Sequence, residues 1–134
     1  MNRTLRIDGH RRGLHEITAS VADIVRDAGL EEALCTVFVR HTSAGLCIQE
    51  NADPSARRDM EAWLDRVAPE GEPWYTHVDE GPDDMPSHLK AILTGGSLAI
   101  PVVDDRLALG TWQGIYLCEF RSRPGTRQVT VLVR

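Results

Sequence analysis

Long apolar runs are absent from this sequence, and so are clusters of positive charge. No stretch approaches the roughly 18 apolar residues that a membrane-spanning helix needs, and the N-terminal residues alternate polar and apolar without a signal-peptide core. The formal net charge of -5 argues against nonspecific binding to nucleic acid or to an anionic membrane, because both reward clustered Lys and Arg. We therefore expect a cytoplasmic protein with no nucleic-acid partner and no membrane partner.

Cysteine is scarce, and no C-x-x-C pair is present. Cys35, Cys47 and Cys118 all fall in strand-like segments, which favours three small buried hydrophobic residues over a disulfide framework. Cys47 keeps a second interpretation as a nucleophile, since it lies close in sequence to His41 and would need a histidine partner in space. The sequence also has no glycine-rich diphosphate loop and no local H-E-x-x-H metal motif.

The length of 134 residues predicts one domain spanning residues 1–134, too short for a TIM barrel of about 250 residues. Helices and strands do not alternate as in a doubly wound sheet, so an α+β fold with a largely antiparallel sheet is expected. Hydrophobic periodicity predicts helices over 18–28, with Thr18 or Ser20 as the cap, over 54–67, and from 85 or 87 to 93. Strands are expected at 3–8, 14–17, 34–40, 46–49, 97–103, 106–112, 115–120 and 127–133.

Polar residues gather around the segment from Val39 to Pro54. Ala44-Gly45 breaks an apolar strand pattern just after His41, Thr42 and Ser43. Asp53 stands where a helix N-cap is wanted, with Pro54 at the first helical position. Side chains at such strand and helix ends are well placed to build a site.

Three histidines lie outside helix interiors and beside other polar groups. Neutral imidazole is the commonest zinc ligand, and catalytic zinc sites often use three protein ligands. The spacings from His41 to His77 to His88 match no local metal motif, however, and residue type alone also fits surface or core histidines. Asp84 and His88 are four residues apart, which places them on one helix face, where Asp84 would either orient His88 or favour the helix N-terminus.

Two later segments also carry candidate residues. Gly110 and Gly114 flank Trp112 and Gln113, which indicates either a bulge with close backbone approach or an ordinary turn with Trp112 in the core. Glu119 interrupts an apolar strand on the face of Ile115 and Leu117, and its carboxylate needs a partner such as Arg121, Arg123, a ligand or solvent.

Four runs of this sequence together resemble the YjbQ family, whose members are commonly described as secondary thiamine-phosphate synthases. They are 41–45 (HTSAG), 50–54 (ENADP), 80–90 (EGPDDMPSHLK) and 109–117 (LGTWQGIYL). Their order is preserved and the resemblance covers nearly the whole chain. It implies a compact α+β sandwich that assembles as a homotrimer.

The resemblance also implies a metal site, with zinc as the expected ion. Its ligands would be His41, His77 and His88, and Asp84 would orient His88. Without the resemblance, the same histidines would remain surface or core residues.

By resemblance, further residues of these runs line the same pocket. Ser43, Asn51 and Gln113 are expected to bind substrate, with Ser43 and Asn51 donating hydrogen bonds to phosphate. Asp53 or Glu119 is expected to act as the general base.

The implied activity couples hydroxymethylpyrimidine diphosphate to a thiazole phosphate as a transferase side reaction, in which a metal would neutralise the leaving diphosphate. A three-histidine site also suits zinc-activated water, so hydrolysis of a small phosphorylated or cyclic metabolite is the alternative. A noncatalytic trimeric ligand-binding or metal-binding protein is a third hypothesis.

Overall fold

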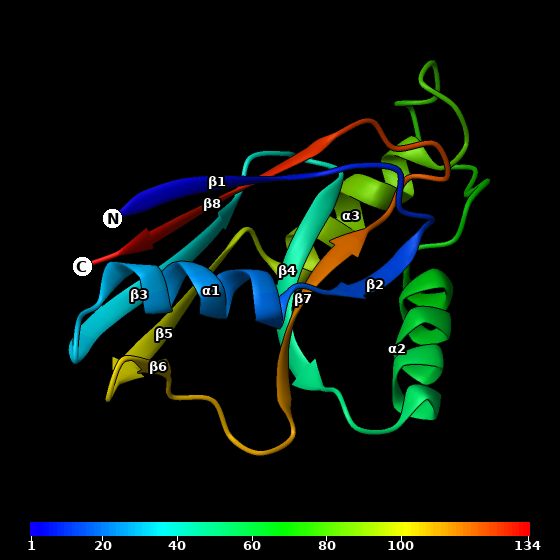
Figure 1. The fold of residues 1–134 in the computed structure, drawn as a ribbon. Coiled ribbons are helices and arrows are strands. Elements are labelled where there is room, and N and C mark those ends of the chain that lie inside the picture. The colour runs from blue at the N-terminus through cyan, green and yellow to red at the C-terminus, as the bar shows by residue number, and fades with distance from the viewer.

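The computed structural model describes residues 1–134 as two antiparallel sheets with three helices (Figure 1). The strands are β1 (Asn2–Ile7), β2 (Gly13–Glu16), β3 (Glu32–Val39), β4 (Ala44–Glu50), β5 (Ser97–Val103), β6 (Arg106–Leu107), β7 (Gln113–Glu119) and β8 (Arg127–Val133). The helices are α1 (Thr18–Ala28), α2 (Pro54–Val67) and α3 (Asp84–Thr94). The sheet orders are β1-β8-β3-β5-β6 and β2-β7-β4, and every pairing is antiparallel. The predicted α+β class is confirmed.

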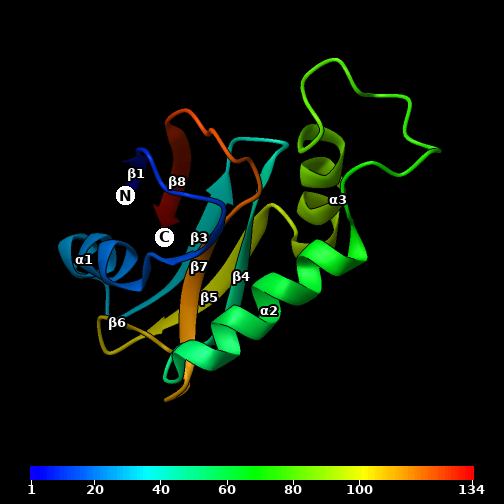
Figure 2. The same ribbon diagram turned by 90° about the vertical axis from the view of Figure 1, so that its right-hand side faces the viewer.

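Strand β7 is buried on both faces and separates two cores. Ile115 and Leu117 point into the main core, which the two sheets and α1 enclose. Tyr116 and Cys118 point the other way, into a smaller core beneath α2 and α3. Figure 2 shows α1 on one side of the sheets and α2 with α3 on the other. A central strand covered on both faces explains why its sequence is almost continuously apolar.

The ends of α1 and α2 follow from local sequence. The Asp53 side chain accepts a hydrogen bond from the Ser55 N–H, and Pro54 opens α2, as predicted. Gly29 ends α1 in a left-handed conformation. The predicted cap of α1 is wrong, because its N-cap is Ile17 and the Thr18 hydroxyl instead accepts a hydrogen bond from the Ile115 N–H.

The predicted strand over 106–112 is also wrong beyond its first two residues. A turn at Asp104-Asp105 with positive φ values returns the chain to β5, but β6 ends at Leu107. The chain then leaves the sheet for a turn in which the Gln113 side chain accepts a hydrogen bond from the Gly110 N–H at 2.7 Å. Trp112 lies 64% exposed on this turn, so it contributes nothing to the core.

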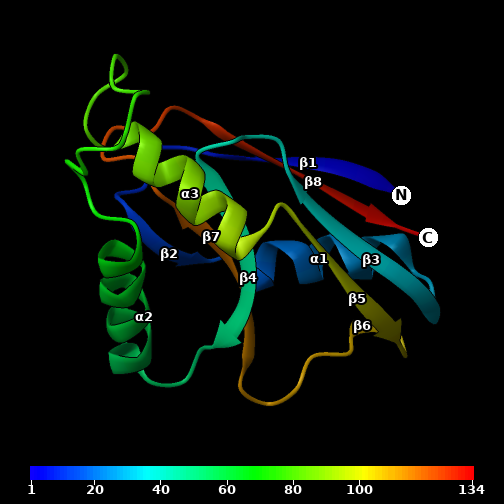
Figure 3. The ribbon, with the colours of Figure 1, turned by 180° about the vertical axis from the view of Figure 1, so that it is seen from behind.

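Helix α3 has a polar inner face and an apolar outer face. Asp84, Ser87 and Lys90 are buried against the rest of the molecule, whereas Ile92 is 80% exposed. Its C-terminal end lies so close to β4 that a Cβ on Gly45 would stand 2.0 Å from the Thr94 hydroxyl oxygen. Figure 3 shows α3 lying across the outer face of β4. The absent side chain at Gly45 therefore permits the contact that places α3.

None of the three helices is both long enough and apolar enough to cross a bilayer.

Candidate metal centre

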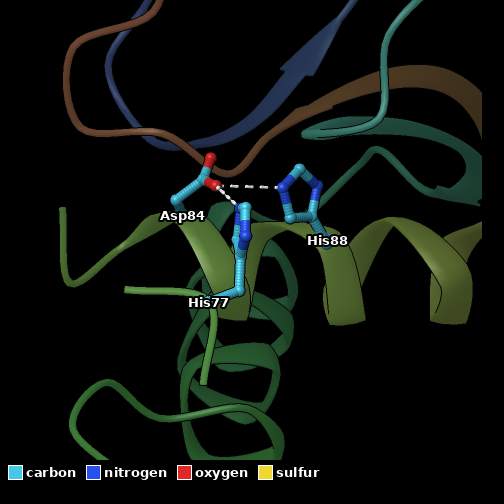
Figure 4. A group of neighbouring side chains, drawn as sticks. All are labelled: His77, Asp84 and His88. Carbon is cyan, nitrogen blue, oxygen red and sulfur yellow. Dashed lines mark hydrogen bonds and ion pairs between the residues drawn. The ribbon is translucent and has the colours of Figure 1, made fainter. Parts of the chain in front are cut away.

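Two histidines and one aspartate converge at the N-terminal end of α3 (Figure 4). Asp84 opens the helix, His88 lies one turn later, and His77 comes from the irregular segment 68–83 that precedes it. One carboxylate oxygen, Asp84 Oδ2, lies 2.8 Å from His77 Nε2 and 3.0 Å from His88 Nε2. The four-residue spacing thus places Asp84 and His88 together as predicted, and the loop adds His77.

Both ring nitrogens of His88 face oxygen acceptors. Nδ1 lies 2.8 Å from the carbonyl oxygen of Thr42, and Nε2 faces the carboxylate of Asp84. The carbonyl and the carboxylate can only accept, and a neutral imidazole has one N–H, so it can donate to only one of them. A metal ion shared by Nε2 and the carboxylate would leave the N–H on Nδ1 for the Thr42 carbonyl.

The second oxygen of Asp84 is held by Arg121. The guanidinium donates from Nη1 to Asp84 Oδ1 at 2.5 Å, from Nε to Asp83 Oδ2 at 3.1 Å, and from Nη2 to the Glu80 carbonyl at 3.0 Å. Burial raises the pKa of Asp84, but the hydrogen bond from His77 and the charges of His88 and Arg121 outweigh burial and hold that pKa below its ordinary value. Asp84 is therefore a carboxylate with a fixed orientation.

The donor set fits a divalent transition metal. Two imidazole nitrogens and a carboxylate form one of the ligand sets of catalytic zinc, with distances of about 2.0 to 2.2 Å to the ion. The three ligand atoms lie within 4.8 Å of one another, so one ion can contact all three. The Asp84 side chain is 5% exposed, whereas that of His77 is 53% exposed, so the solvent side of the cluster is open. Arg121 and the Thr42 carbonyl hold the ligands from behind, as partners outside a metal's ligand set do.

A pocket of about 280 Å³ lies beside His77. Tyr75, Val78, Pro82 and Met85 line it, so its walls are mainly apolar and aromatic. It is formed by the irregular segment and the start of α3. A small molecule in this pocket would sit next to one of the three potential metal ligands.

The structure does not bring His41 into this cluster. His41 Nε2 accepts a hydrogen bond from the Gln128 N–H at 2.8 Å, so its lone pair is already used. Burial and the nearby charge of Arg127 lower the pKa of His41, which keeps the ring neutral with its proton on Nδ1. Asp84, which sequence reasoning placed behind His88, instead faces both histidines.

Glu119 lies nearby in a buried ion pair. Its carboxylate accepts hydrogen bonds from Arg127 Nε at 2.7 Å and from Arg127 Nη2 at 2.6 Å, and a third from the backbone N–H of Arg121. Arg127 Nη2 also donates to the Ser43 carbonyl at 3.3 Å. Neither the Glu119 carboxylate nor the Ser43 hydroxyl contacts the histidine cluster, so their roles as base and substrate ligand stay predictions.

The other candidate residues lie at the far end of the β4–β7 pair. The Asn51 side chain donates to Glu16 Oε2 at 3.1 Å, Gln113 closes the turn at Gly110, and Asp53 caps α2. Strand β4 separates the two groups by six residue steps, or about 20 Å at 3.3 Å per residue. We call the cluster of His77, Asp84 and His88 the histidine end, and the group of Asn51, Asp53 and Gln113 the amide end.

Sequence reasoning did not find two contributors to the histidine end. The sequence suggests Arg121 only as a partner for Glu119, whereas in the structure it follows β7 and its side chain reaches back to Asp84. The Thr42 carbonyl is a backbone group and carries no residue signal. The signals in the sequence that point to this corner are the histidines and the four-residue spacing of Asp84 and His88.

Comparison with known proteins gives the family. The family model described as UPF0047 protein YjbQ-like matches residues 3–134. The chain belongs to the YjbQ family. It is 48% identical to the UPF0047 protein sll1880 of Synechocystis over 122 residues, covering 91% of this chain and 83% of that relative. It is 43% identical to the UPF0047 protein YjbQ of Salmonella typhimurium, covering 95% and 92% of the two chains.

Solved structures of YjbQ relatives share the whole fold. A YjbQ/UPF0047 protein of Clostridium acetobutylicum matches with a TM-score of 0.87 and 36% identity, covering 100% of this chain and 99% of the other. A protein of Sulfolobus solfataricus, described as being of unknown function, matches with a TM-score of 0.90 and 25% identity, covering 99% and 95%. The family and its fold are thus established for this chain.

Proposed function

We propose that this YjbQ-family chain is a zinc-dependent enzyme that hydrolyses a small phosphorylated metabolite at the histidine end. The observation that carries the proposal is the convergence of His77 Nε2, His88 Nε2 and Asp84 Oδ2, three potential ligand atoms that lie within 4.8 Å of one another. One cation could contact all three. The open solvent side leaves room for water and substrate.

Zinc bound there would supply Lewis acidity, which polarises a phosphoryl oxygen and lowers the pKa of water at the open position. The chain's own residues supply the geometry. The Thr42 carbonyl fixes the His88 ring with its Nε2 turned toward Asp84, and Arg121 fixes the carboxylate. The pocket beside His77, with Tyr75 at its wall, would hold the organic part of the substrate.

The resemblance to the YjbQ family suggests a second activity, the coupling of hydroxymethylpyrimidine diphosphate to thiazole phosphate. The same ligand set would hold an ion that neutralises the leaving diphosphate, and the apolar pocket beside His77 accommodates a heterocycle. We propose this coupling as a side activity. Pyrophosphate release in the presence of both substrates would detect it, whereas hydrolysis releases inorganic phosphate from one substrate alone.

We also propose that the chain assembles as a homotrimer. Large apolar side chains lie exposed outside the groove between α2 and α3, with Ile92 on α3 at 80% and Phe38 on β3 at 50% exposure. Burying them against other copies would remove apolar surface from water. A native mass of three times 14.9 kDa is expected, and Ile92→Glu should shift it toward the monomer.

Metal content of the purified protein tests the proposal first. We expect close to one zinc per chain, lost in His77→Ala and in His88→Ala. The matched control is His41→Ala, which removes the third histidine of the sequence prediction and should keep its zinc. Iron in place of zinc would indicate a different chemistry for the same ligands, since two histidines and a carboxylate also bind Fe(II).

No bound metal, even after zinc is supplied, would contradict the proposal. With zinc present, phosphate release from a panel of phosphorylated metabolites should depend on it and should stop in His88→Ala. Stoichiometric zinc with no turnover on any of them would instead favour a noncatalytic metal-binding protein.

A further inference from the structure

Two of the three cysteines touch each other across the smaller sheet, away from the histidine end. Cys47 on β4 lies opposite Tyr116 on β7, and Cys118 follows two residues later on the same face of β7. The two sulfur atoms are 3.5 Å apart, with the Cys118 thiol directed at Cys47 Sγ. Cys35 lies on β3 in the other sheet and has no such neighbour.

The two thiols differ in their access to solvent. Cys118 is fully buried beneath α2 and α3. Cys47 is half-buried and lines a groove of about 350 Å³ between these helices, together with Met60, Trp63 and Leu93. A small reagent can therefore reach Cys47 but not Cys118.

The contact also shifts the pKa values of the two thiols in opposite directions. The hydrogen bond from Cys118 lowers the pKa of Cys47, whereas the same contact and burial raise the pKa of Cys118. Burial alone raises the pKa of Cys35 to about 11. A thiolate is the nucleophilic form, so Cys47 is the most reactive thiol of the three.

We propose that Cys47 and Cys118 form a redox-active thiol pair that is oxidised by a hydroperoxide. The Cys47 thiolate attacks the peroxide oxygen, which breaks the O–O bond, leaves Cys47 as a sulfenic acid and releases an alkoxide or hydroxide that takes up a proton. The sulfur of Cys118 then attacks Cys47 Sγ. The S–O bond breaks, the Cys118 proton leaves with the hydroxide as water, and a disulfide forms. The two thiols have lost two electrons and the peroxide has gained them.

Little movement is needed for the second step. The sulfur atoms are already in contact at 3.5 Å and have to close to about 2.05 Å. Diagonal partners on neighbouring strands are farther apart than directly opposite ones, so β4 shifts slightly toward β7. A small dithiol would reverse the reaction by thiol–disulfide exchange.

Counting free thiols tests this inference independently of metal or activity. The full-length protein is treated with hydrogen peroxide, unfolded and titrated with a thiol reagent. We expect the three thiols to fall to one, and peptide mapping to join Cys47 to Cys118. Dithiothreitol should restore all three.

Single substitutions separate the roles of the cysteines. Cys35→Ser should still lose two thiols, as the matched control. In Cys118→Ser, the sulfenic acid at Cys47 should persist long enough to be captured by dimedone. Cys47→Ser should keep both remaining thiols under the same exposure. Loss of thiols in Cys47→Ser at the wild-type rate, or a peroxide-treated wild type whose Cys47 carries sulfinic acid beside a free Cys118, would overturn the proposal.

Discussion

The two ends of the β4–β7 pair use polar side chains in opposite ways. At the amide end, each side chain completes local structure: Asn51 pairs with Glu16, Gln113 closes a turn and Asp53 caps a helix. At the histidine end, three potential metal-ligand atoms of His77, Asp84 and His88 converge on one another and on the solvent side of the cluster. A polar residue at a strand end does not by itself indicate a site. What distinguishes the histidine end is that several potential ligand atoms converge there, whereas each side chain of the amide end completes its own local structure.

The largest expected effect comes from Glu119→Gln, beside the histidine end. The substitution leaves Arg127 buried with an unpaired charge, which should lower the free energy of unfolding by about 3 to 5 kcal/mol. Urea unfolding measures it. Glu16→Gln, exposed at the amide end, should change the same quantity by less than about 0.5 kcal/mol. Equal losses of unfolding free energy in Glu119→Gln and Glu16→Gln would contradict the contrast between the two ends. Full turnover in Glu119→Gln would show that Glu119 is not the general base.

Asp84→Asn and Asp53→Asn compare one carboxylate from each end. Asp84→Asn removes the charge that faces both histidines, so zinc affinity should fall more than about 100-fold, beyond the loss typical of residues that only support a ligand. Asp53→Asn should leave zinc affinity unchanged, because an asparagine still caps α2. Competition with a chromogenic chelator measures both. A zinc defect in Asp53→Asn would mean that the two ends meet in one site.

Gly45→Ala should disturb the histidine end through the backbone. The new Cβ would overlap the Thr94 hydroxyl and displace α3, which lowers the free energy of unfolding by about 1 to 3 kcal/mol and weakens zinc binding. Adding Thr94→Ala should recover most of both losses. Gly114→Ala crowds Glu16 at the amide end and should spare zinc binding. Unchanged zinc affinity in Gly45→Ala would show that α3 is not placed by this contact.

Arg121→Gln should weaken zinc binding about 10- to 100-fold by freeing the second oxygen of Asp84. Arg123→Gln is the matched control, since Arg123 lies exposed two residues away. Arg121→Lys should recover only part of the affinity, because one ammonium cannot reproduce three directed hydrogen bonds. Isothermal titration calorimetry measures the series, and equal affinities for the Arg121 and Arg123 variants would refute the positioning role.

The smallest effect is the pH dependence contributed by Asp83. Burial raises its pKa, but hydrogen bonds from Ser122 and Arg121 outweigh burial and hold the pKa below its ordinary value of 3.8. A depressed pKa in the folded state adds stability above pH 3.8, which is lost as the pH falls through the lower, folded value. Asp83→Asn should therefore show a flatter fall in unfolding free energy in acid. A curve parallel to that of the wild type would refute the assignment.

Elements that depend on local sequence patterns could be predicted from the sequence. Asp53 and Pro54 fix the start of α2, so its range of 54–67 was predicted to the residue. The spacing of Asp84 and His88 likewise placed them together. His77 could not be positioned in the same way, because the segment 68–83 has no periodicity from which its path follows.

Contacts that depend on the tertiary fold could not be predicted from the sequence. Glu119 pairs with the side chain of Arg127, eight residues away, rather than with those of the nearer Arg121 or Arg123, because β8 returns beside it after a turn. The separation of the amide end from the histidine end also depends on the length of β4. Four motifs in one order therefore suggested one pocket, whereas in the single chain their residues lie at the two ends of β4.

The inverted polarity of α3 sets how this helix can dock. Lys90 bonds to Asp65 at 2.6 Å and Asp84 to Arg121, so the face that α3 turns to the interior contains paired charges as well as Pro86. Sliding or rotating the helix by one residue would leave both buried charges without partners, at a free-energy cost that an apolar face would not impose. The paired charges therefore restrict the helix to one docking register. Its two potential metal ligands, Asp84 and His88, are accordingly presented in a single geometry.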